Sequence, residues 1–243
     1  MVVTSPVPET PQADLGKLYE DGHGVPQDYV QAAVWYRKAA EQGLSPDARY
    51  NLGLLYFYGQ GVALDYAEAA HWLREATDTI RGHTDAQYYL GFMYQSGRVV
   101  PHDDVQAAMW YRKAAEGDRE DMLQTIAGEL VWAKSTDKGC SEAQFNLGKM
   151  CEEGRGVKQD YAQAAHWYRK AAEQGHSDAQ YNLGVLYDNG QGVPQDGLQA
   201  ALWYRKARED GPTDVDAQEI REHQSPQSRK MYPKLSEDQK KWI

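Results

Sequence analysis

The chain has 243 residues, which is enough for one or two ordinary domains. Its formal net charge of −10 argues against a nucleic-acid-binding protein, because phosphate contacts need an excess of Lys and Arg. No stretch approaches the roughly 18 consecutive apolar residues of a membrane span, and residues 1–12 lack the basic start and apolar core of a secretion signal. We therefore expect a cytoplasmic protein, or a periplasmic or secreted one if a signal peptide has been removed.

Two sequence blocks recur along the chain and predict its fold class. The first block ends in Leu-Gly and occurs five times, at Gly16, Gly53, Gly91, Gly148 and Gly184. The second block, Ala-Ala-x-Trp-Tyr-Arg-Lys-Ala, follows each of these glycines, in an altered form in the second copy. A long internal period of this kind is typical of proteins in which each repeat is one helix pair. We predict an all-α fold: a right-handed α/α superhelical solenoid of five helix-pair repeats, with one degenerate half-repeat and a C-terminal cap.

The repeats divide the chain into segments. In chain order we expect an N-terminal extension at 1–10, repeats one to three at 11–121, a degenerate helical insertion at 122–140, repeats four and five at 141–211, and a C-terminal capping segment at 212–243.

Each repeat is expected to hold two helices joined by a Gly-x-Gly-Val turn. Apolar residues at spacings of three and four within residues 48–59 predict the first helix. The turn glycines end it, because Gly tolerates the positive φ of a helix C-terminus. One Asp per repeat can cap the second helix, which is worth about 1 kcal/mol per site. These residues are Asp28, Asp65, Asp103, Asp160 and Asp196.

The glycine of each Leu-Gly pair falls in mid-helix, where Gly costs about 1 kcal/mol relative to Ala. We expect close helix approach to compensate, with the paired helix or the next repeat's Trp packed on bare backbone. The Trp of the second block is assigned to the core in every repeat: Trp35, Trp72, Trp110, Trp167 and Trp203. On the exposed side, i,i+4 ion pairs are expected between Arg37 and Glu41, Arg112 and Glu116, and Arg169 and Glu173.

Two segments break the repeat. Met122, Leu123, Ile126 and Leu130 are spaced as an apolar helical stripe, so the insertion is predicted to be a sixth unit that has lost its first helix. A partner-specific insertion is the alternative. Residues 212–243 are expected to pack on the fifth repeat, because a solenoid needs a cap over its last apolar face. The alternative is a linear motif that docks elsewhere.

The combined motif of Leu-Gly-x-x-Tyr, Gly-x-Gly-Val, Asp, Ala-Ala-x-Trp and a closing Ala resembles the Sel-one-like repeat (SLR) family, relatives of the tetratricopeptide repeats. The resemblance covers residues 11–211. It implies an adaptor or scaffold, in bacterial signalling, secretion, host interaction or toxin immunity. Cys151 departs from the motif by replacing its Tyr, and Gly97-Arg98-Val99 lacks the second Gly. One branch of the family has a disulfide in each helix pair, but here Cys140 and Cys151 lie roughly 13 Å apart along one helix, so two free thiols are expected.

No catalytic or metal-binding pattern stands out. The seven His are scattered, and no His-x-x-x-His or Cys-x-x-Cys occurs. The Gly-x-Gly pairs are repeated helix ends and no strand precedes them, so they are not a dinucleotide fingerprint. We predict no catalytic residues, no metal and no cofactor.

The surface of the first helices is the remaining candidate for function. The side away from the core is predicted to bind a protein or peptide, through an apolar patch with acidic neighbours. Its residues are Tyr50, Leu54, Phe57, Tyr58, Tyr88, Tyr89, Phe92, Phe145, Lys149, Tyr181 and Val185. Tyr50, Tyr88, Phe145 and Tyr181 share one repeat position, so sealing adjacent first helices is an equal alternative for them. Leu54, Phe57 and Phe92 depart from the repeat pattern and are the stronger binding candidates.

The predicted function is therefore a protein-protein interaction scaffold or adaptor that binds a partner protein on its concave face, without catalysis. An immunity or inhibitor protein that neutralises one toxin or effector enzyme is the alternative. The oligomeric state and the partner do not follow from these patterns.

Overall fold

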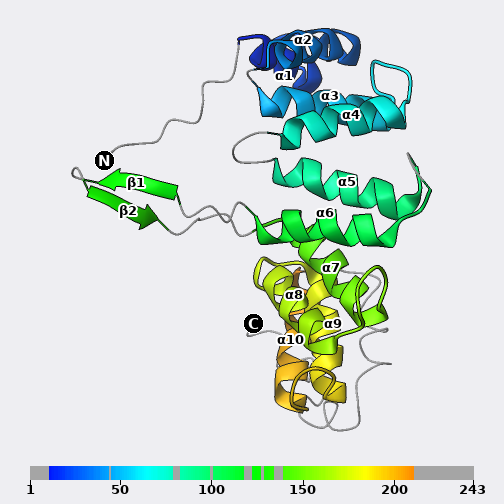
Figure 1. The fold of residues 1–243 in the computed structure, drawn as a ribbon, viewed down its shortest axis with the longest axis vertical. Coiled ribbons are helices and arrows are strands. Elements are labelled where there is room, and N and C mark those ends of the chain that lie inside the picture. Colours follow the sequence, from blue (N-terminus) through cyan, green and yellow to red (C-terminus); the bar gives the residue numbers. More distant parts are fainter. Residues whose placement is uncertain are drawn as a thin grey trace, which may run out of the picture. The chain divides into compact units, whose positions relative to one another are not determined.

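The computed structural model describes residues 11–43, 45–78, 83–98, 101–117, 122–126, 129–133 and 139–210. They form ten helices and one β-hairpin (Figure 1). The expected N-terminal extension and the capping segment at 212–243 lie outside these residues. The chain divides into two compact units, residues 1–137 and 138–243. Among the described helices, none has the length and apolar character needed to cross a membrane.

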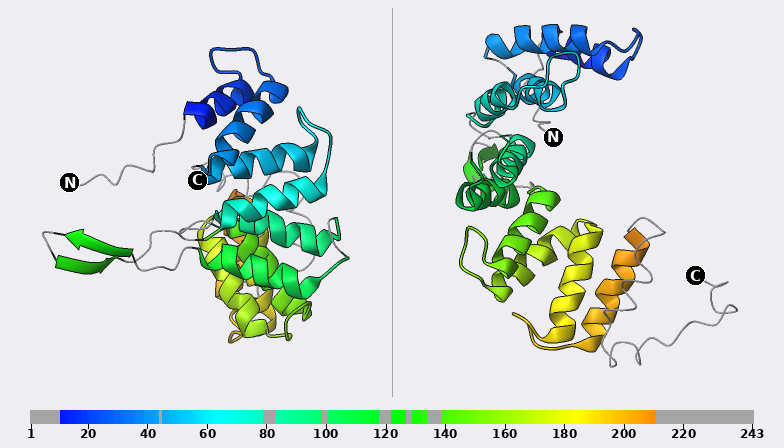
Figure 2. Two further views of the ribbon diagram at one scale, coloured as in Figure 1. Left: turned by 45° about the horizontal axis from the view of Figure 1, so that its top comes forward. Right: turned by 90° about the vertical axis from the view of Figure 1, so that its right-hand side faces the viewer.

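Each unit is built from consecutive helix pairs (Figures 1 and 2). The N-terminal unit pairs α1 (Pro11–Asp21) with α2 (Tyr29–Glu41), α3 (Pro46–Tyr58) with α4 (Tyr66–Thr77), and α5 (Thr84–Ser96) with α6 (Asp104–Glu116). The C-terminal unit pairs α7 (Ser141–Glu153) with α8 (Tyr161–Glu173), and α9 (Ser177–Asn189) with α10 (Gly197–Asp210). The all-α helix-pair fold is confirmed; its superhelical handedness stays a prediction. We call the odd-numbered helices the first helices and the even-numbered ones the second helices.

The predicted helix ends are confirmed. The Asp28 carboxylate accepts hydrogen bonds from the backbone N–H groups of Val30 and Gln31, at 2.9 and 3.1 Å. The equivalent Asp caps every other second helix in the same way. All five first helices end at a glycine in the left-handed region, where an L side chain would be strained. These are Gly22, Gly59, Gly97, Gly154 and Gly190.

Each mid-helix glycine lies against a large side chain of the paired second helix. A Cβ atom built on Gly91 would fall 2.7 Å from Tyr111 Cδ1, and one built on Gly148 would fall 2.7 Å from Tyr168 Cδ1. Gly16 meets Tyr36 and Gly184 meets Tyr204 in the same way. Only repeat two differs: there the partner of Gly53 is Leu73, with a nearest approach of 3.0 Å. The expected close approach is confirmed, and the paired helix provides it.

The assignment of all five Trp to the core holds only in part: Trp72 and Trp110 pack against core clusters without being fully buried. Trp167 is buried, whereas Trp35, Trp72, Trp110 and Trp203 are only partly buried. The ammonium groups of Lys38, Lys113, Lys170 and Lys206 lie 4.2–4.9 Å from the Trp ring centroids of their own helices. The fully buried aromatic residue is the Tyr that follows Trp, because a helix turns about 100° per residue and only one of two neighbours can face the glycine.

Three of the buried Tyr hydroxyl groups donate hydrogen bonds to the paired first helix. Tyr36 donates to the Glu20 carboxylate at 2.5 Å, and Tyr168 donates to that of Glu152 at 2.6 Å. Burial, reinforced by the neighbouring carboxylate, raises the pKa of both Tyr hydroxyls far above the ordinary value. In repeat three Tyr111 donates to the Gln95 amide oxygen at 2.8 Å. The acceptor stands four residues after the mid-helix glycine in each case, so one turn of the first helix provides both the space and the acceptor.

Arginines of the second helices join successive repeats. Arg74 donates to the Tyr94 hydroxyl at 2.8 Å, and Arg169 donates to that of Tyr187 at 2.5 Å. Arg37 donates in the same way to Tyr56. The expected i,i+4 pairs of Arg37 and Arg169 with Glu are therefore replaced by bonds to the next first helix; in the described residues the i,i+4 ion pair that forms is Arg205 with Glu209.

The prediction of a helix in the insertion is wrong. Strands β1 (Met122–Ile126) and β2 (Glu129–Ala133) pair antiparallel, with Met122 opposite Ala133 and Ile126 opposite Glu129. A short apolar run fits both periods, so its spacing did not distinguish helix from strand. The β-branched and aromatic residues of the segment favour a strand. These are Thr125, Ile126, Val131 and Trp132.

The two cysteines form no disulfide, as expected. Cys151 is buried in α7, at the motif position where other repeats have Tyr, and Cys140 is the residue before that helix.

The contact between Gly91 and Tyr111 gives a testable prediction. Gly91→Ala should destabilise the protein by about 1–3 kcal/mol, because the new methyl group overlaps a fully buried ring. Gly53→Ala is the matched control and should cost less, since Leu73 leaves more room. Thermal unfolding followed by circular dichroism measures both. Equal melting temperatures for Gly91→Ala and the wild type would contradict the packing argument.

Candidate protein-binding face

The predicted binding residues of repeats two and three lie together in one aromatic cluster. Phe57 is at its centre, with ring centroids of its neighbours at 5.0 to 6.1 Å. The Tyr58 and Tyr89 hydroxyls are hydrogen-bonded at 3.0 Å. Burial, together with this bond, raises the pKa of Tyr89 far above its ordinary value. The members of the cluster are Tyr50, Phe57, Tyr58, Tyr66, Tyr88, Tyr89 and Phe92.

The expectation that Phe57 is available to a partner is wrong, because only 5% of the residue is exposed. It belongs to the buried cluster that includes Leu73. Phe57 stands four residues after Gly53, where the other repeats have Glu20, Gln95, Glu152 and Asp188. Its departure from the repeat pattern is therefore a packing adjustment.

Three residues that are linked through the Tyr36 hydroxyl in repeat one are all different at the corresponding positions of repeat two. In repeat one the Tyr36 hydroxyl meets Glu20 and also the Asn51 side chain of the next repeat. In repeat two the corresponding residues are Leu73, Phe57 and Tyr89. Leu73 has no hydroxyl, so neither a carboxylate nor an amide is needed beside it, and two aromatic rings take their places. The polar arrangement is exchanged for an apolar one as a unit.

The aromatic residues at the shared repeat position mainly seal the structure. Tyr88, Phe145 and Tyr181 lie with ring centroids 5.6–5.9 Å from the buried Tyr of their own pair. Tyr50 stacks on His83 at 4.2 Å, and Phe145 stacks on His176 at 4.6 Å. Each of these His side chains caps the next first helix, accepting from a backbone N–H. These contacts agree with the alternative that the four rings seal adjacent helices together. All four rings nevertheless remain partly exposed.

The other predicted residues differ in exposure. Tyr58 is 53% exposed, and Leu54, Phe92 and Val185 are partly buried. The Arg98 guanidinium lies 5.2 Å from the ring centroids of Phe92 and Tyr66 and 5.3 Å from that of Phe57. Arg98 stands in the turn that lacks the second Gly, and its guanidinium thus covers the apolar cluster. Lys149 is exposed on α7.

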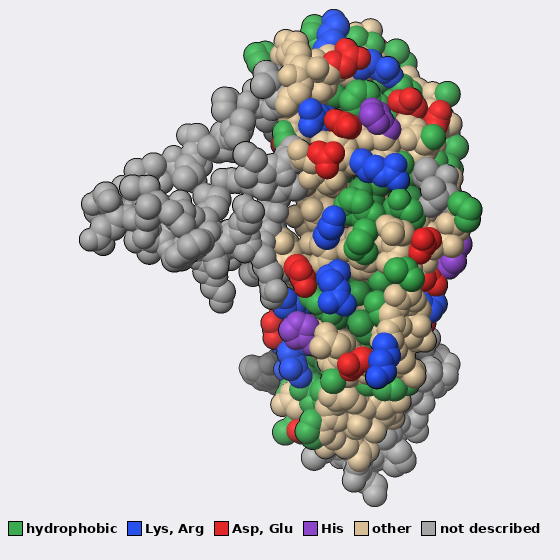
Figure 3. All heavy atoms as spheres, viewed as in Figure 1, with side chains coloured by type: hydrophobic (Ala, Val, Ile, Leu, Met, Phe, Trp, Pro, Cys, Tyr) green, Lys and Arg blue, Asp and Glu red, His purple; other side chains and the backbone are tan. Residues whose placement is uncertain are grey.

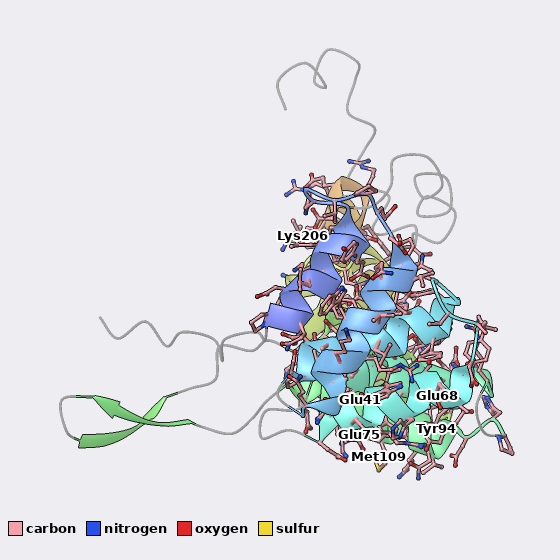
Figure 4. The ribbon with its side chains drawn as sticks, turned by 90° about the horizontal axis from the view of Figure 1, so that it is seen from above. Glu41, Glu68, Glu75, Tyr94, Met109 and Lys206 are labelled. Carbon is pink, nitrogen blue, oxygen red and sulfur yellow. The ribbon has the colours of Figure 1, made fainter. Side chains whose placement is uncertain are left out.

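Sequence reasoning missed an apolar surface on the second helices. Val30 and Val34 on α2, and Val105 and Met109 on α6, are between 42% and 63% exposed. Met109 lies at the outer edge of the N-terminal unit in Figure 4, and Figure 3 shows hydrophobic side chains beside Lys and Arg over these helices. Both residues of each helix are four apart and flank the Ala-Ala pair, a pattern that a comparison of the second block among repeats could have detected.

The two sets of helices differ in charge. The described first helices carry three Lys or Arg against ten Asp or Glu, whereas the second helices carry ten against eight. Among the described helices, the excess of acidic residues therefore lies on the first helices, where the predicted binding residues are.

One ion pair lies on this face of the N-terminal unit. His83 Nε2 is 3.3 Å from Asp47 Oδ1, and 56% of the Asp47 side chain is exposed. The hydrogen bond to His83 lowers the pKa of Asp47, against the opposing effect of partial burial. Asp47 is therefore ionised at neutral pH. Lys17 adds a smaller attraction in the same direction.

No group of three or more His, Cys, Asp or Glu side chains that could hold a metal ion occurs within the part of the chain that the structure describes. The described residues define a helical repeat protein whose first helices carry an excess of acidic residues and whose second helices carry mixed charge and exposed apolar residues. Binding of another macromolecule is the chemistry that such an arrangement offers.

Comparisons with known proteins agree with this class. A family model described as Sel1 repeat matches residues 12–44, 46–78, 84–118, 141–176 and 177–212. The chain belongs to the Sel1 repeat family, as the motif resemblance indicated. Proteins of this family are generally interaction scaffolds and are typically not catalytic. No curated protein matches the chain significantly.

Two solved structures are similar in sequence and in fold. One is a protective antigen present in uropathogenic Escherichia coli strains that displays an SLR fold, with 37% identity over 83% of this chain and a TM-score of 0.71. This chain spans only 38% of that antigen's length. The other is a Sel1 repeat protein from Oxalobacter formigenes, with 31% identity, a TM-score of 0.70, and coverage of 86% of this chain and 75% of that one.

The linked residues of repeat two give a prediction on stability. Phe57→Glu should cost roughly 3 kcal/mol or more, because it removes a buried ring and buries a carboxylate without its partner. Adding Leu73→Tyr should recover at least about 1 kcal/mol, since the pair then matches Tyr36 with Glu20. Chemical denaturation of both variants and of Leu73→Tyr alone measures the coupling. Strictly additive effects would show that the two positions are independent.

The ion pair gives a prediction on titration. His83→Ala should raise the pKa of Asp47 toward its ordinary value, because the variant removes the main hydrogen bond that lowers it. The folded-state pKa of Asp47 is depressed, so the pair stabilises the protein above the unfolded-state pKa and the effect is lost as the pH falls through the folded-state pKa. Carboxyl ¹³C NMR titration measures the shift, with His102→Ala as a control that should leave Asp47 unchanged.

Proposed function

We propose that this protein is a non-catalytic interaction scaffold that binds a basic or mixed-charge segment of a partner protein on the first-helix face. The charge difference between the first and second helices is the observation that carries this proposal. A surface with a large excess of carboxylates attracts Lys and Arg and repels acidic partners, which supports specificity and fast association.

Some of these carboxylates have structural roles as well. Glu20 and Glu152 accept from buried Tyr hydroxyls, and Asp47 pairs with His83. Others, such as Asp14 and Asp85, are exposed on the same face. The first helices also carry the partly exposed rings of the shared repeat position, so a bound segment would meet both aromatic surface and negative charge. Aromatic residues of this kind are common anchors in protein interfaces.

The proposal predicts that binding depends on first-helix carboxylates. A triple variant Asp14→Asn, Asp21→Asn and Asp85→Asn should weaken partner binding by about tenfold, a loss of roughly 1.4 kcal/mol for three exposed charges. The matched control Glu41→Gln, Glu173→Gln and Glu209→Gln removes as many exposed carboxylates from second helices and should have little effect. Partners are recovered by affinity capture with mass spectrometry and then measured purified, at two salt concentrations.

Equal affinities for the two triple variants, or a loss only in the second-helix control, would refute the proposed face. Weaker binding at high salt is also expected. The number of partners distinguishes the two versions of the function. Several partners of moderate affinity are expected for a scaffold, whereas one partner bound with near-nanomolar affinity would favour an immunity or inhibitor protein.

A further inference from the structure

A small hollow opens on the first-helix face of the N-terminal unit. Its volume is about 210 Å³, and its walls come from α1, α2, α3 and the start of α5. Ligand pockets for drug-sized molecules measure about 300–1,000 Å³, so this hollow suits a single side chain. Its polar lining residues include Lys17, Asp47, Asn51, His83 and Asp85.

The hollow exists because repeat one has a small residue where the others have a ring. Ala13 stands three residues before Gly16, at the position of Tyr50, Tyr88, Phe145 and Tyr181. In repeats three to five that ring lies over the buried Tyr of its own pair. Without such a ring, Tyr36 and Ala13 become part of the wall of the hollow.

The next helix cap is also small at this point. Tyr50 and Phe145 stack on capping His side chains of the following repeat, His83 and His176. The residue at the equivalent cap after repeat one is Ser45, which accepts from the Ala48 backbone N–H. A stacked aromatic pair is thus replaced by Ala and Ser, which removes two rings from one place.

We propose that this hollow receives an arginine side chain of the bound partner segment, an inference that rests on the proposed first-helix binding face. Asp85 and Asp47, the latter paired with His83, bring two carboxylates to the hollow, and the partly exposed ring of Tyr50 gives it aromatic surface. A planar guanidinium can pair with carboxylates and lie against aromatic rings, which an ammonium group does less well.

The charges around the hollow favour a cation. Lys17 offsets one of the two lining carboxylates and His83 pairs with Asp47, while α1 carries three further acidic residues outside the lining, Asp14, Glu20 and Asp21. Asp85 makes no ion pair with any residue that the structure describes and is exposed. Arg49 on α3 does not line the hollow and donates to the Glu75 backbone carbonyl at 2.9 Å. An entering guanidinium therefore meets net negative charge.

The test uses small probes and the full chain. Nα-acetyl-arginine methylamide is titrated into ¹⁵N-labelled protein, and amide shifts of Tyr50, Asn51 and Asp85 are followed. The citrulline analogue, which has nearly the same shape without charge, and the acetyl-glutamate analogue are the control probes. Saturable binding of the arginine probe is expected in the millimolar range, with the citrulline probe at least about fivefold weaker.

Ala13→Tyr is the decisive variant, because it restores the ring that the other four repeats carry at this position. The variant should keep the wild-type melting temperature and weaken the arginine probe by about tenfold or more. Asp85→Asn, an exposed substitution that spares the core, should weaken it about two- to fivefold. If Ala13→Tyr fails to fold, Asp85→Asn alone decides the outcome.

Unchanged binding in Asp85→Asn, citrulline binding equal to arginine, or stronger binding of the glutamate probe would each overturn the arginine site. Failure of this site and failure of the proposed function are distinguishable. If the arginine probe does not bind but the first-helix triple variant still loses its partner, the binding face stands and the hollow is not its arginine site. If the triple variant keeps full affinity, the proposed face itself is wrong.

Discussion

A tyrosine ring packed directly on helix backbone determines the geometry of four of the five described helix pairs. At the point of contact the first helix has glycine, because a Cβ atom there would fall 2.5–2.8 Å from the ring. The ring is large, fully buried and polar at one end, so its hydroxyl needs a partner. In three of these four pairs the first helix provides that partner one turn later, as Glu20, Gln95 and Glu152 do. Part of the negative charge of the first helices thus follows from the packing of the pair.

Residues fixed by local backbone chemistry could be predicted from the sequence. The Asp caps, the turn glycines and the mid-helix glycines depend on one or two neighbours in the chain, and each was found where expected. Which aromatic residue faces the glycine could not be predicted this way. Trp and the following Tyr are adjacent, and the choice depends on the rotation of the second helix against its partner, which the apolar pattern does not determine to within one residue.

Phe57 shows why a departure from a repeat pattern is ambiguous when one position is considered alone. Phe57 had the expected properties of a binding residue, apolar where other repeats are polar. Its meaning became clear only with Leu73 in the paired helix and Tyr89 in the next repeat, which changed with it. Three residues in three helices exchange a hydroxyl network for an apolar contact. The hairpin at 122–133 was missed for a different reason, since a run of about ten residues with apolar spacing fits a helix and a strand equally well.

The same comparison between repeats separates two kinds of departure. In repeat two, a lost polar contact is matched by rings that fill the space, and the result is buried. In repeat one, Ala13 and Ser45 are both smaller than their counterparts, no larger residue compensates, and a hollow remains. Because each repeat of a solenoid contacts only its neighbours, a local loss of packing costs stability locally and leaves the other pairs intact. An uncompensated departure is therefore the kind that a repeat protein can keep for binding, and a compensated one is the kind that only maintains the fold.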